Sequence, residues 1–302
     1  MKKVLIILCL VALSFLTISC EKEKEEVKII VPLGTPYLAI SGLLDYEKVE
    51  IQTTNGASNL QAALTGDSYD IVIAPLNLGA NLYKKGSSQY KLASILTLSN
   101  AYIVTKEENK LDSISDLNGK KVKAFAESGI PASTLKKAFN DNNLDTTNIS
   151  YLSSSSDLYS AFLANGIEEE YILLSEPEVS KLAKEMNIKK LDLSQELNQD
   201  IIQACIFVNP ISSKTNQINE VLNKIKENVT FLNDSPQSYA DKIIPLDYTE
   251  TLSKGMGKDI IINSIPLSNI VYLEGKANQE EVLKTLKFLL GEGYNISDEF
   301  YY

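Results

Sequence analysis

Five turns with polar, Gly or Pro residues carry the groups best suited to chemistry. Each turn follows a predicted strand and leads toward a predicted helix. They are Gly34-Thr35-Pro36-Tyr37, Asn55-Gly56-Ala57-Ser58, Ala74-Pro75-Leu76-Asn77, Ser128-Gly129-Ile130-Pro131 and Ser175-Glu176-Pro177. Free N–H groups at helix starts, with neighbouring hydroxyls and amides, can bind small polar molecules. Caps and turns use the same residue types, so the informative feature is the whole set.

The composition excludes several other kinds of chemistry. The 302 residues include 39 Asp and Glu and 29 Lys, with no Arg, His or Trp, for a net charge of −10. Without His there is no His-based nucleophile system and no His-ligated zinc. An acidic chain without Arg is poorly suited to nucleic acid and offers no bidentate guanidinium for an anion. We therefore expect no catalytic residue, metal site, cofactor or nucleic-acid partner.

The predicted ligand contacts come from the five turns and from the polar pair Ser99-Asn100. They are Thr35, Tyr37, Asn55, Ser58, Pro75, Asn77 and Asn100 in the first part of the chain, then Ser128, Gly129 and Glu176. A neutral heterocycle could stack on Tyr37 while Asn55 and Asn77 bind its polar edge. A small anion could instead be held by N–H groups and hydroxyls alone. The acidic charge of the chain favours the neutral heterocycle.

Alternating strands and helices must position these turns. Short apolar runs predict strands, and segments with helical periodicity follow most of them. The predicted strands are 28–33, 49–53, 69–74, 92–98, 102–105, 122–126, 149–152, 171–174 and 201–208. The predicted helices are 58–64, 77–85, 131–140, 157–164, 179–186, 218–232, 237–243 and 279–290. This alternation indicates an α/β protein with mostly parallel sheets flanked by helices.

The strand–helix pattern restarts after residue 100, which predicts two lobes in series. Residues 28–100 plus 211–302 form the expected first lobe and 101–210 the second. The chain is expected to cross between them near Ser99–Ala101 and again near Asn209-Pro210. Cys205 lies in an apolar run and is expected to be a small core residue.

The N-terminus has the three-part pattern of a secretory signal peptide, predicted over residues 1–19. Two Lys precede an apolar stretch over 4–18, which is too short for a comfortable membrane span. Leu16-Thr17-Ile18-Ser19-Cys20 resembles the bacterial lipobox, although Thr17 stands where Leu is usual. The resemblance implies that Cys20 carries acyl chains, palmitate among them, and that 20–27 is a tether. The alternative is an ordinary signal peptide that leaves Cys20 as a free thiol.

Several segments of the chain together resemble the type 2 periplasmic-binding-protein fold. They resemble most closely the solute-binding lipoproteins of nitrate/sulfonate/taurine ABC importers, a class that is similar to thiamine-precursor binders. The segments are Leu60-Gln61-Ala62-Ala63-Leu64-Thr65-Gly66, Tyr69-Asp70-Ile71-Val72-Ile73-Ala74-Pro75, Leu82-Tyr83-Lys84-Lys85-Gly86, Ile103-Val104-Thr105, Ile114-Ser115-Asp116-Leu117-Asn118-Gly119-Lys120-Lys121-Val122 and Leu174-Ser175-Glu176-Pro177.

This resemblance implies a monomeric, lipid-anchored protein on the extracytoplasmic face of the cell membrane. It would capture a small solute in a cleft between lobes and deliver it to an ABC permease and its ATPase. Two departures concern the ligand: Glu168-Glu169-Glu170-Tyr171 replaces a common Gly-x-x-Asp-Ala pattern, and no Arg is present.

Two other functions fit the same fold. One is an enzyme of the menaquinone or thiamine biosynthesis type, which the signal-like N-terminus disfavours because such enzymes work in the cytoplasm. The other is a sensory or adhesive lipoprotein whose cleft has degenerated.

Overall fold

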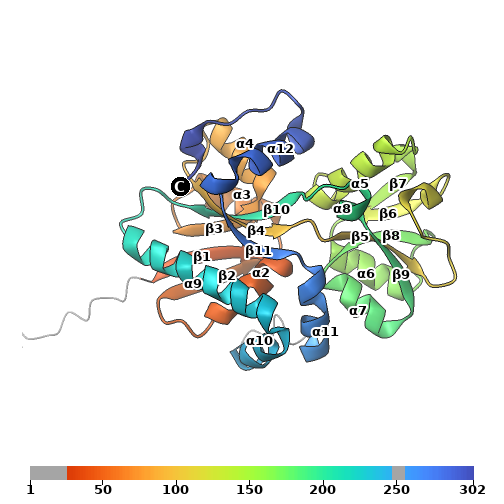
Figure 1. The fold of residues 1–302 in the computed structure, drawn as a ribbon, viewed down its shortest axis with the longest axis horizontal. Coiled ribbons are helices and arrows are strands. Elements are labelled where there is room, and N and C mark those ends of the chain that lie inside the picture. Colours follow the sequence, from red (N-terminus) through yellow and green to blue (C-terminus); the bar gives the residue numbers. More distant parts are fainter. Residues whose placement is uncertain (1–25, 247–255) are drawn as a thin grey trace, which may run out of the picture.

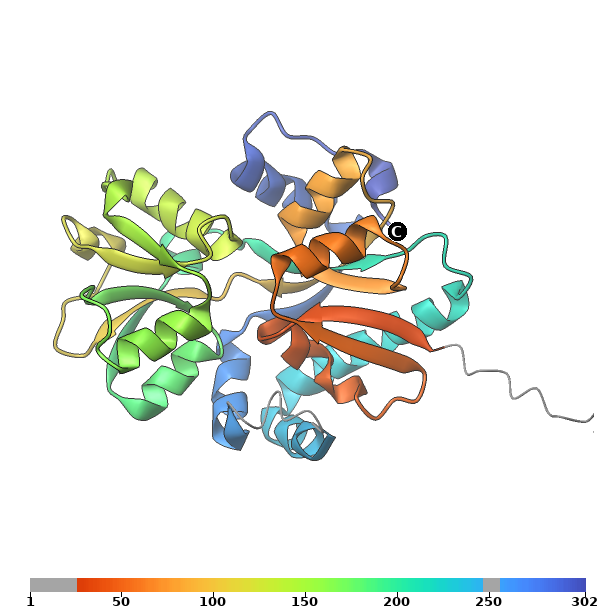
Figure 2. The ribbon, with the colours of Figure 1, turned by 180° about the vertical axis from the view of Figure 1, so that it is seen from behind.

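The computed structural model describes residues 26–246 and 256–302, which form two lobes side by side (Figure 1). Each lobe has one β-sheet with helices against it, as the view from behind also shows (Figure 2). The predicted two-lobed α/β architecture is therefore confirmed. The predicted signal segment and Cys20 lie outside the described residues.

The first lobe is built on a six-stranded sheet. Its strands are β1 (Val27–Pro32), β2 (Val49–Thr54), β3 (Ile71–Pro75), β4 (Lys91–Leu98), β10 (Ile202–Val208) and β11 (Ile270–Glu274), in the spatial order β11-β4-β10-β3-β1-β2. β1 pairs in parallel with β2 and β3, whereas β10 is antiparallel to β3 and β4, and β11 is antiparallel to β4. β1 to β4 thus all point the same way, and their carboxyl ends lie at one end of the sheet.

Helices cover both faces of this sheet. α2 (Thr35–Ile40), α9 (Thr215–Asp234), α10 (Pro236–Ile243) and α11 (Gly257–Ser264) pack on one face, while α3 (Ala57–Thr65), α4 (Leu76–Lys84) and α12 (Gln279–Leu290) pack on the other. Ile29 and Val31 of β1 join the core on the first face, and Ile30 joins the core on the second. Strands buried on both faces need apolar residues at successive positions, which explains the continuous apolar runs in the sequence.

The second lobe has a five-stranded sheet. Its strands are β5 (Ala101–Lys106), β6 (Val122–Phe125), β7 (Ile149–Leu152), β8 (Tyr171–Ser175) and β9 (Ile188–Asp192), in the order β7-β6-β8-β5-β9. β6 pairs in parallel with β7 and β8, and β5 is antiparallel to β8 and β9. Around it lie α5 (Ile130–Asp141), α6 (Ser155–Leu163), α7 (Glu178–Glu185) and α8 (Leu193–Glu196).

Two adjacent chain segments connect the lobes. The first is Ser99-Asn100, between β4 and β5, and the second comes between α8 and β10. The two segments are hydrogen-bonded to each other, because the Ser99 N–H donates to the Ile201 carbonyl oxygen at 2.7 Å. Asn269 of the first lobe also donates to the Ser99 carbonyl oxygen, at 2.6 Å. This pair of crossings forms the hinge between the lobes.

The position of β10 corrects the predicted end of the second lobe at residue 210. β10 is inserted between β3 and β4, with Ala204 opposite Pro75, so the chain has already returned to the first lobe before residue 202. Its apolar residues are buried on both faces of the first sheet, which is why the run is so hydrophobic. Asn209-Pro210 marks the end of this strand rather than a crossing.

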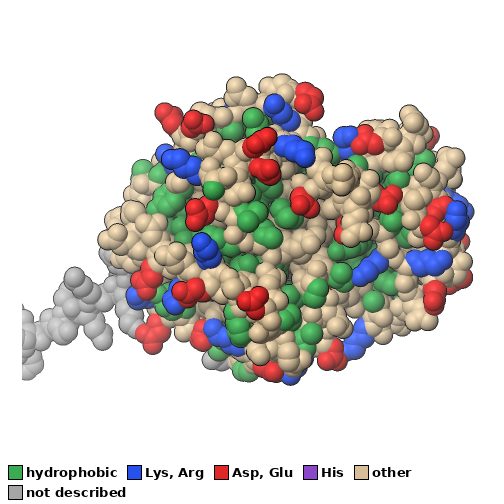
Figure 3. Space-filling view, in the orientation of Figure 1, with side chains coloured by type: hydrophobic (Ala, Val, Ile, Leu, Met, Phe, Trp, Pro, Cys, Tyr) green, Lys and Arg blue, Asp and Glu red, His purple; other side chains and the backbone are tan. Residues whose placement is uncertain are grey.

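Cys205 is fully buried in β10, as predicted from its apolar neighbours. Burial raises the pKa of its thiol. Within residues 26–246 and 256–302, no helix combines the length and the hydrophobicity that crossing a membrane requires. Figure 3 shows Lys and acidic side chains mixed over the visible face of both lobes.

Candidate functional site

A cavity of about 400 Å³ lies between the lobes. Strands of both sheets end at this cavity, which is where ligands bind in open α/β sheets. Its volume is within the range of small-molecule sites. The lining residues are Pro32, Leu33, Gly34, Thr35, Pro36, Tyr37, Thr54, Asn55, Asn100, Phe125, Ser154, Ser155, Ser156, Ser175, Glu176, Pro177, Glu178, Lys181, Gln203 and Met256.

The turn after β1 places the start of α2 against this cavity. Gly34 has a φ of +92°, a conformation that glycine adopts without the clash a side chain would make. Pro36 follows in the first turn of α2, where its missing N–H is of no consequence. All six residues of α2 are buried, so the helix is held firmly in the first lobe.

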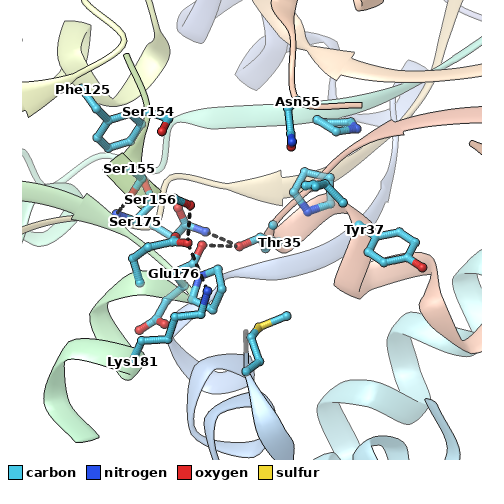
Figure 4. Close-up of a pocket in the computed structure, with 18 of the residues that line it drawn as sticks. Thr35, Tyr37, Asn55, Phe125, Ser154, Ser155, Ser156, Ser175, Glu176 and Lys181 are labelled. Atoms are coloured by element: carbon cyan, nitrogen blue, oxygen red, sulfur yellow. Dashed lines mark hydrogen bonds and ion pairs between the residues drawn. The ribbon is translucent and has the colours of Figure 1, made fainter. Parts of the chain in front are cut away.

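Thr35 connects the two lobes across the cavity (Figure 4). Asn100 of the hinge donates from Nδ2 to Thr35 Oγ1 at 2.8 Å. Thr35 Oγ1 in turn donates to the backbone carbonyl oxygen of Glu176 at 3.1 Å. All three residues are buried, and the chain of hydrogen bonds runs from the hinge through the first lobe to the second.

The second lobe contributes the start of α6. Ser154 caps this helix by accepting from the Asp157 N–H at 3.1 Å, and Ser155 Oγ accepts from the Ser175 N–H at 3.3 Å. Ser156 Oγ donates to Glu178 Oε1 at 3.0 Å. The three hydroxyls at this helix start are thus already engaged within the second lobe.

Glu176 is the most unusual ionisable group of the cavity. The residue is only 3% exposed, and Oε2 accepts a hydrogen bond from the Ser180 N–H at 3.2 Å. Burial raises the pKa of this carboxyl group to about 7, because a charged carboxylate loses its hydration. Glu178 differs, since Lys181 Nζ lies 3.5 Å from its Oε1. The cavity therefore holds one compensated carboxylate and one uncompensated carboxyl group.

The family of the chain follows from comparison with known proteins. The model of the NMT1/THI5-like family matches residues 48–238, which is more than half of the chain. The chain belongs to the NMT1/THI5-like family. A search of curated proteins finds no match.

Solved structures resemble this NMT1/THI5-like chain over nearly its whole length. An ABC transporter protein from Parabacteroides distasonis superposes with a TM-score of 0.72 at 18% identity, covering 92% of this chain and 98% of that one. The aliphatic sulphonate-binding protein SsuA from Escherichia coli gives 0.68 at 12%, covering 89% and 87%. The nitrate-binding protein NrtA from Synechocystis gives 0.68 at 11%, covering 92% and 84%. These likenesses confirm the type 2 periplasmic-binding-protein fold that the sequence resembles.

Half of the predicted contact residues line the cavity of this NMT1/THI5-like protein. They are Thr35, Tyr37, Asn55, Asn100 and Glu176. Tyr37, however, belongs to the core of the first lobe and is 2% exposed, so its ring is not available for stacking. In Figure 4 that ring points away from the labelled residues of the second lobe. Phe125 supplies an aromatic ring from the opposite lobe instead.

The other predicted residues, Ser58, Pro75, Asn77, Ser128 and Gly129, are not among the lining residues. Ser58 and Ser128 are exposed. Pro75 lies opposite Ala204 of β10, and Asn77 Oδ1 accepts from the Leu78 N–H of its own helix.

Gly129 lies in a tight turn before α5 and is not among the lining residues. The Gly129 N–H donates to the Ala126 carbonyl oxygen at 2.6 Å, and Ala126 has a positive φ of 47°. This tight turn follows β6 directly, and Phe125, the last residue of that strand, lines the cavity.

Sequence reasoning missed several lining residues because they come from distant segments. Gln203 lies in β10, and Met256 directly precedes α11. α11 belongs to the first lobe but lies next to α7 of the second, where Lys184 Nζ and Asp259 Oδ2 are 3.9 Å apart. Ser154–Ser156 do carry a sequence signal, a run of four Ser directly after a predicted strand, but such a run is equally typical of a solvated loop with a helix cap.

No group of three or more Cys, Asp and Glu side chains in the described residues is arranged to hold a metal ion.

Proposed function

We propose that this protein is an extracytoplasmic solute-binding lipoprotein that captures a small molecule between its lobes and delivers it to an ABC importer. The observation that carries the proposal is the cavity itself, lined by strand ends of both lobes around a two-segment hinge. A solute that contacts both lobes favours their closed arrangement, because it binds that arrangement more tightly. The ABC-transporter proteins of the same fold support the delivery step.

Membrane attachment through Cys20 is part of the same proposal. The signal-like N-terminus and lipobox-like sequence support it. The acyl chains would hold the protein as a monomer at the outer face of the membrane, beside the permease.

The proposal also assigns no catalysis to the cavity. Among the described residues that line it, the charged side chains Glu178 and Lys181 are paired with each other, and the Glu176 carboxyl group is held by Ser180 and enclosed by both lobes. A bound solute is expected to leave the protein chemically unchanged.

One experiment tests capture and anchoring together. The protein is extracted with detergent from membranes of its own host and analysed intact by native mass spectrometry. We expect a co-purifying small molecule and a chain that begins at acylated Cys20. Refolded, solute-free protein should gain about 2.7 kcal/mol of stability when that molecule is added at 100 times its Kd. A chain that carries no solute, and whose melting temperature no solute in a broad panel changes, would contradict capture. A non-acylated chain in the soluble fraction would contradict anchoring.

A further inference from the structure

The buried polar atoms that lack partners at the cavity are mainly hydrogen-bond acceptors. Four buried side-chain atoms of the described lining residues have no hydrogen-bond partner: Asn100 Oδ1, Glu176 Oε1, Gln203 Oε1 and Ser175 Oγ. Buried polar groups are normally paired, and an unpaired one is costly. Three side-chain oxygens gathered at one cavity therefore indicate a missing donor-rich partner.

The surrounding hydrogen bonds fix which atom of the Asn100 amide remains unpaired. Thr35 Oγ1 uses its only hydrogen for the Glu176 carbonyl oxygen, so it must accept from Asn100 Nδ2. Asn100 Nδ2 also lies 3.5 Å from the Ser268 carbonyl oxygen, which can only accept. The amide therefore cannot be reversed without losing both bonds, and its unpaired atom is an acceptor.

The charges around Glu176 leave its carboxyl group without a close cation. On α7, Lys181 pairs with Glu178, whose negative charge opposes ionisation of Glu176. The Ser180 hydroxyl and N–H, and then Lys190 on β9, favour the carboxylate and lower its pKa, but together they do so less than burial raises it. On the first lobe and hinge, Thr35 bonds to the backbone carbonyl oxygen of Glu176 and Asn100 bonds to Thr35, and both side chains are neutral.

An anionic ligand would meet unfavourable groups at the same cavity. The start of α6 is already capped by Ser154, and Asp157 in its first turn adds a negative charge. Glu176 and Glu178 both line the cavity. Among the described lining residues, Lys181 is the only cation, and it pairs with Glu178. Like charges brought this close in a buried site repel strongly.

We infer that the cavity binds a small nitrogen base, an amine, amidine or amino-heterocycle that donates N–H hydrogen bonds to Glu176 Oε1 and Asn100 Oδ1 and pairs with Glu176 as a cation. This inference rests on the proposed function and names the solute class of the same cavity. Gln203 and Ser175 would accept further N–H groups, and Phe125 would contact the carbon skeleton. The structural relatives named for sulphonate and nitrate are named for anions, whereas the solute inferred here is a cation.

Matched pairs of solutes on one skeleton test this inference by isothermal titration calorimetry on refolded, solute-free protein. The pairs are benzamidine and benzoate, propylamine and propanesulfonate, and 4-aminopyridine and pyridine-4-carboxylate. Only the nitrogen bases are expected to bind. Glu176→Gln should raise their Kd at least tenfold, because a buried charge pair is lost. The matched control Glu185→Gln removes an exposed carboxylate from α7, the helix that follows Glu176, and should change Kd less than twofold.

The pH dependence of binding can be measured on the wild-type protein, so it tests the inference even if Glu176→Gln folds poorly. A cation needs Glu176 ionised, so the Kd of wild-type protein should rise by up to tenfold per pH unit below about pH 7. Glu176→Gln should show no such slope.

The outcomes separate an error in the inferred solute class from an error in the proposed function of solute capture. Binding of the anionic members, or an unchanged Kd in Glu176→Gln, overturns the inference but leaves capture standing. If none of the six probes binds, the solute that co-purifies from the host decides: a nitrogen base supports the inference and an anion overturns it. If no solute co-purifies either, the inference and the proposed function both fail.

Discussion

At the scale of single residues, the carboxyl group of Glu176 is placed where its ionised form is destabilised. Its ordinary pKa is 4.5, and burial raises it to about 7 in the folded protein. The folded state therefore binds the proton more tightly than the unfolded state does. Folding stability is unaffected below about pH 4.5, falls as the pH rises through this interval, and stays reduced above pH 7. The loss amounts to about 3 kcal/mol.

Replacing Glu176 by Gln should remove this loss. We expect solute-free Glu176→Gln to be more stable than the wild type by about 2 to 3 kcal/mol at pH 8, with the difference close to zero at pH 4. Urea denaturation at both pH values measures it. Equal destabilisation of the variant at both pH values would show that the carboxyl group does not titrate between 4.5 and 7.

At the scale of elements, three helices are tied together behind the cavity. Asn228 of α9 donates from Nδ2 to the Ala39 carbonyl oxygen of α2 at 2.6 Å. The Tyr239 hydroxyl of α10 donates to the Leu38 carbonyl oxygen at 2.6 Å and accepts from the Gly42 N–H at 3.0 Å. These buried bonds fix the end of α2, and hence the helix that begins at Thr35.

Tyr239→Phe should therefore destabilise the protein. Removing the hydroxyl leaves the Gly42 N–H and the Leu38 carbonyl oxygen without this partner, at a cost of about 2 to 4 kcal/mol. Urea denaturation should show a lower midpoint with an unchanged slope. Tyr69→Phe is the control, since the Tyr69 hydroxyl bonds to Gln52 at the surface and its loss should cost less than about 1 kcal/mol. Similar midpoints for both variants would contradict the structural role of this network.

The elements also show how much of the fold the sequence could predict. Each of the nine predicted strands overlaps an observed strand, because most of them are apolar runs of the kind that strands covered on both faces require. β9 and β11 were missed. Residues Ile188–Asp192 contain two Lys, and Ile270–Glu274 ends in an exposed acid. Both strands lie at a sheet edge, where side chains face water and the apolar signal is weak. β2 and β7 are edge strands too, but β2 alternates apolar and polar residues and β7 has three apolar residues of four.

The site was less predictable than the fold, for a physical reason. Turns after β1 and β8 were recognised because strand ends carry local signals, and these turns do reach the cavity. The insertion of β10 beside β3 depends on pairing between segments about 130 residues apart, which no local pattern reveals. That pairing is what brings Gln203 to the cavity.

At the scale of the whole molecule, the lobes meet through very few buried polar contacts among the described residues 26–246 and 256–302. The Thr35–Glu176 hydrogen bond joins them across the cavity, and the Tyr102 hydroxyl of β5 donates to the Leu267 carbonyl oxygen at 2.8 Å beside the hinge. A single bond of this kind contributes about 1 kcal/mol. The balance between open and closed arrangements is therefore sensitive to one side chain.

Thr35→Val keeps the shape of the side chain but removes the hydroxyl. We expect it to shift the protein toward the open arrangement and to raise the Kd of the bound solute about fivefold, which corresponds to about 1 kcal/mol. Small-angle X-ray scattering of the solute-free variant should give a larger radius of gyration than that of the wild type. Thr35→Ser retains the hydroxyl and should restore both values; if Ser behaves like Val, the hydrogen bond is not the cause.

The burial of Cys205 makes this opening and closing directly observable. A thiol that is fully enclosed and has a raised pKa reacts very slowly with maleimide dyes. The described part of the chain therefore already behaves as a cysteine-free background, with its native core intact. Cysteines introduced at the exposed positions Ser58 and Ser128, one on each lobe, would take a donor and an acceptor dye. Energy transfer between the two dyes would then follow the movement of the lobes in single molecules.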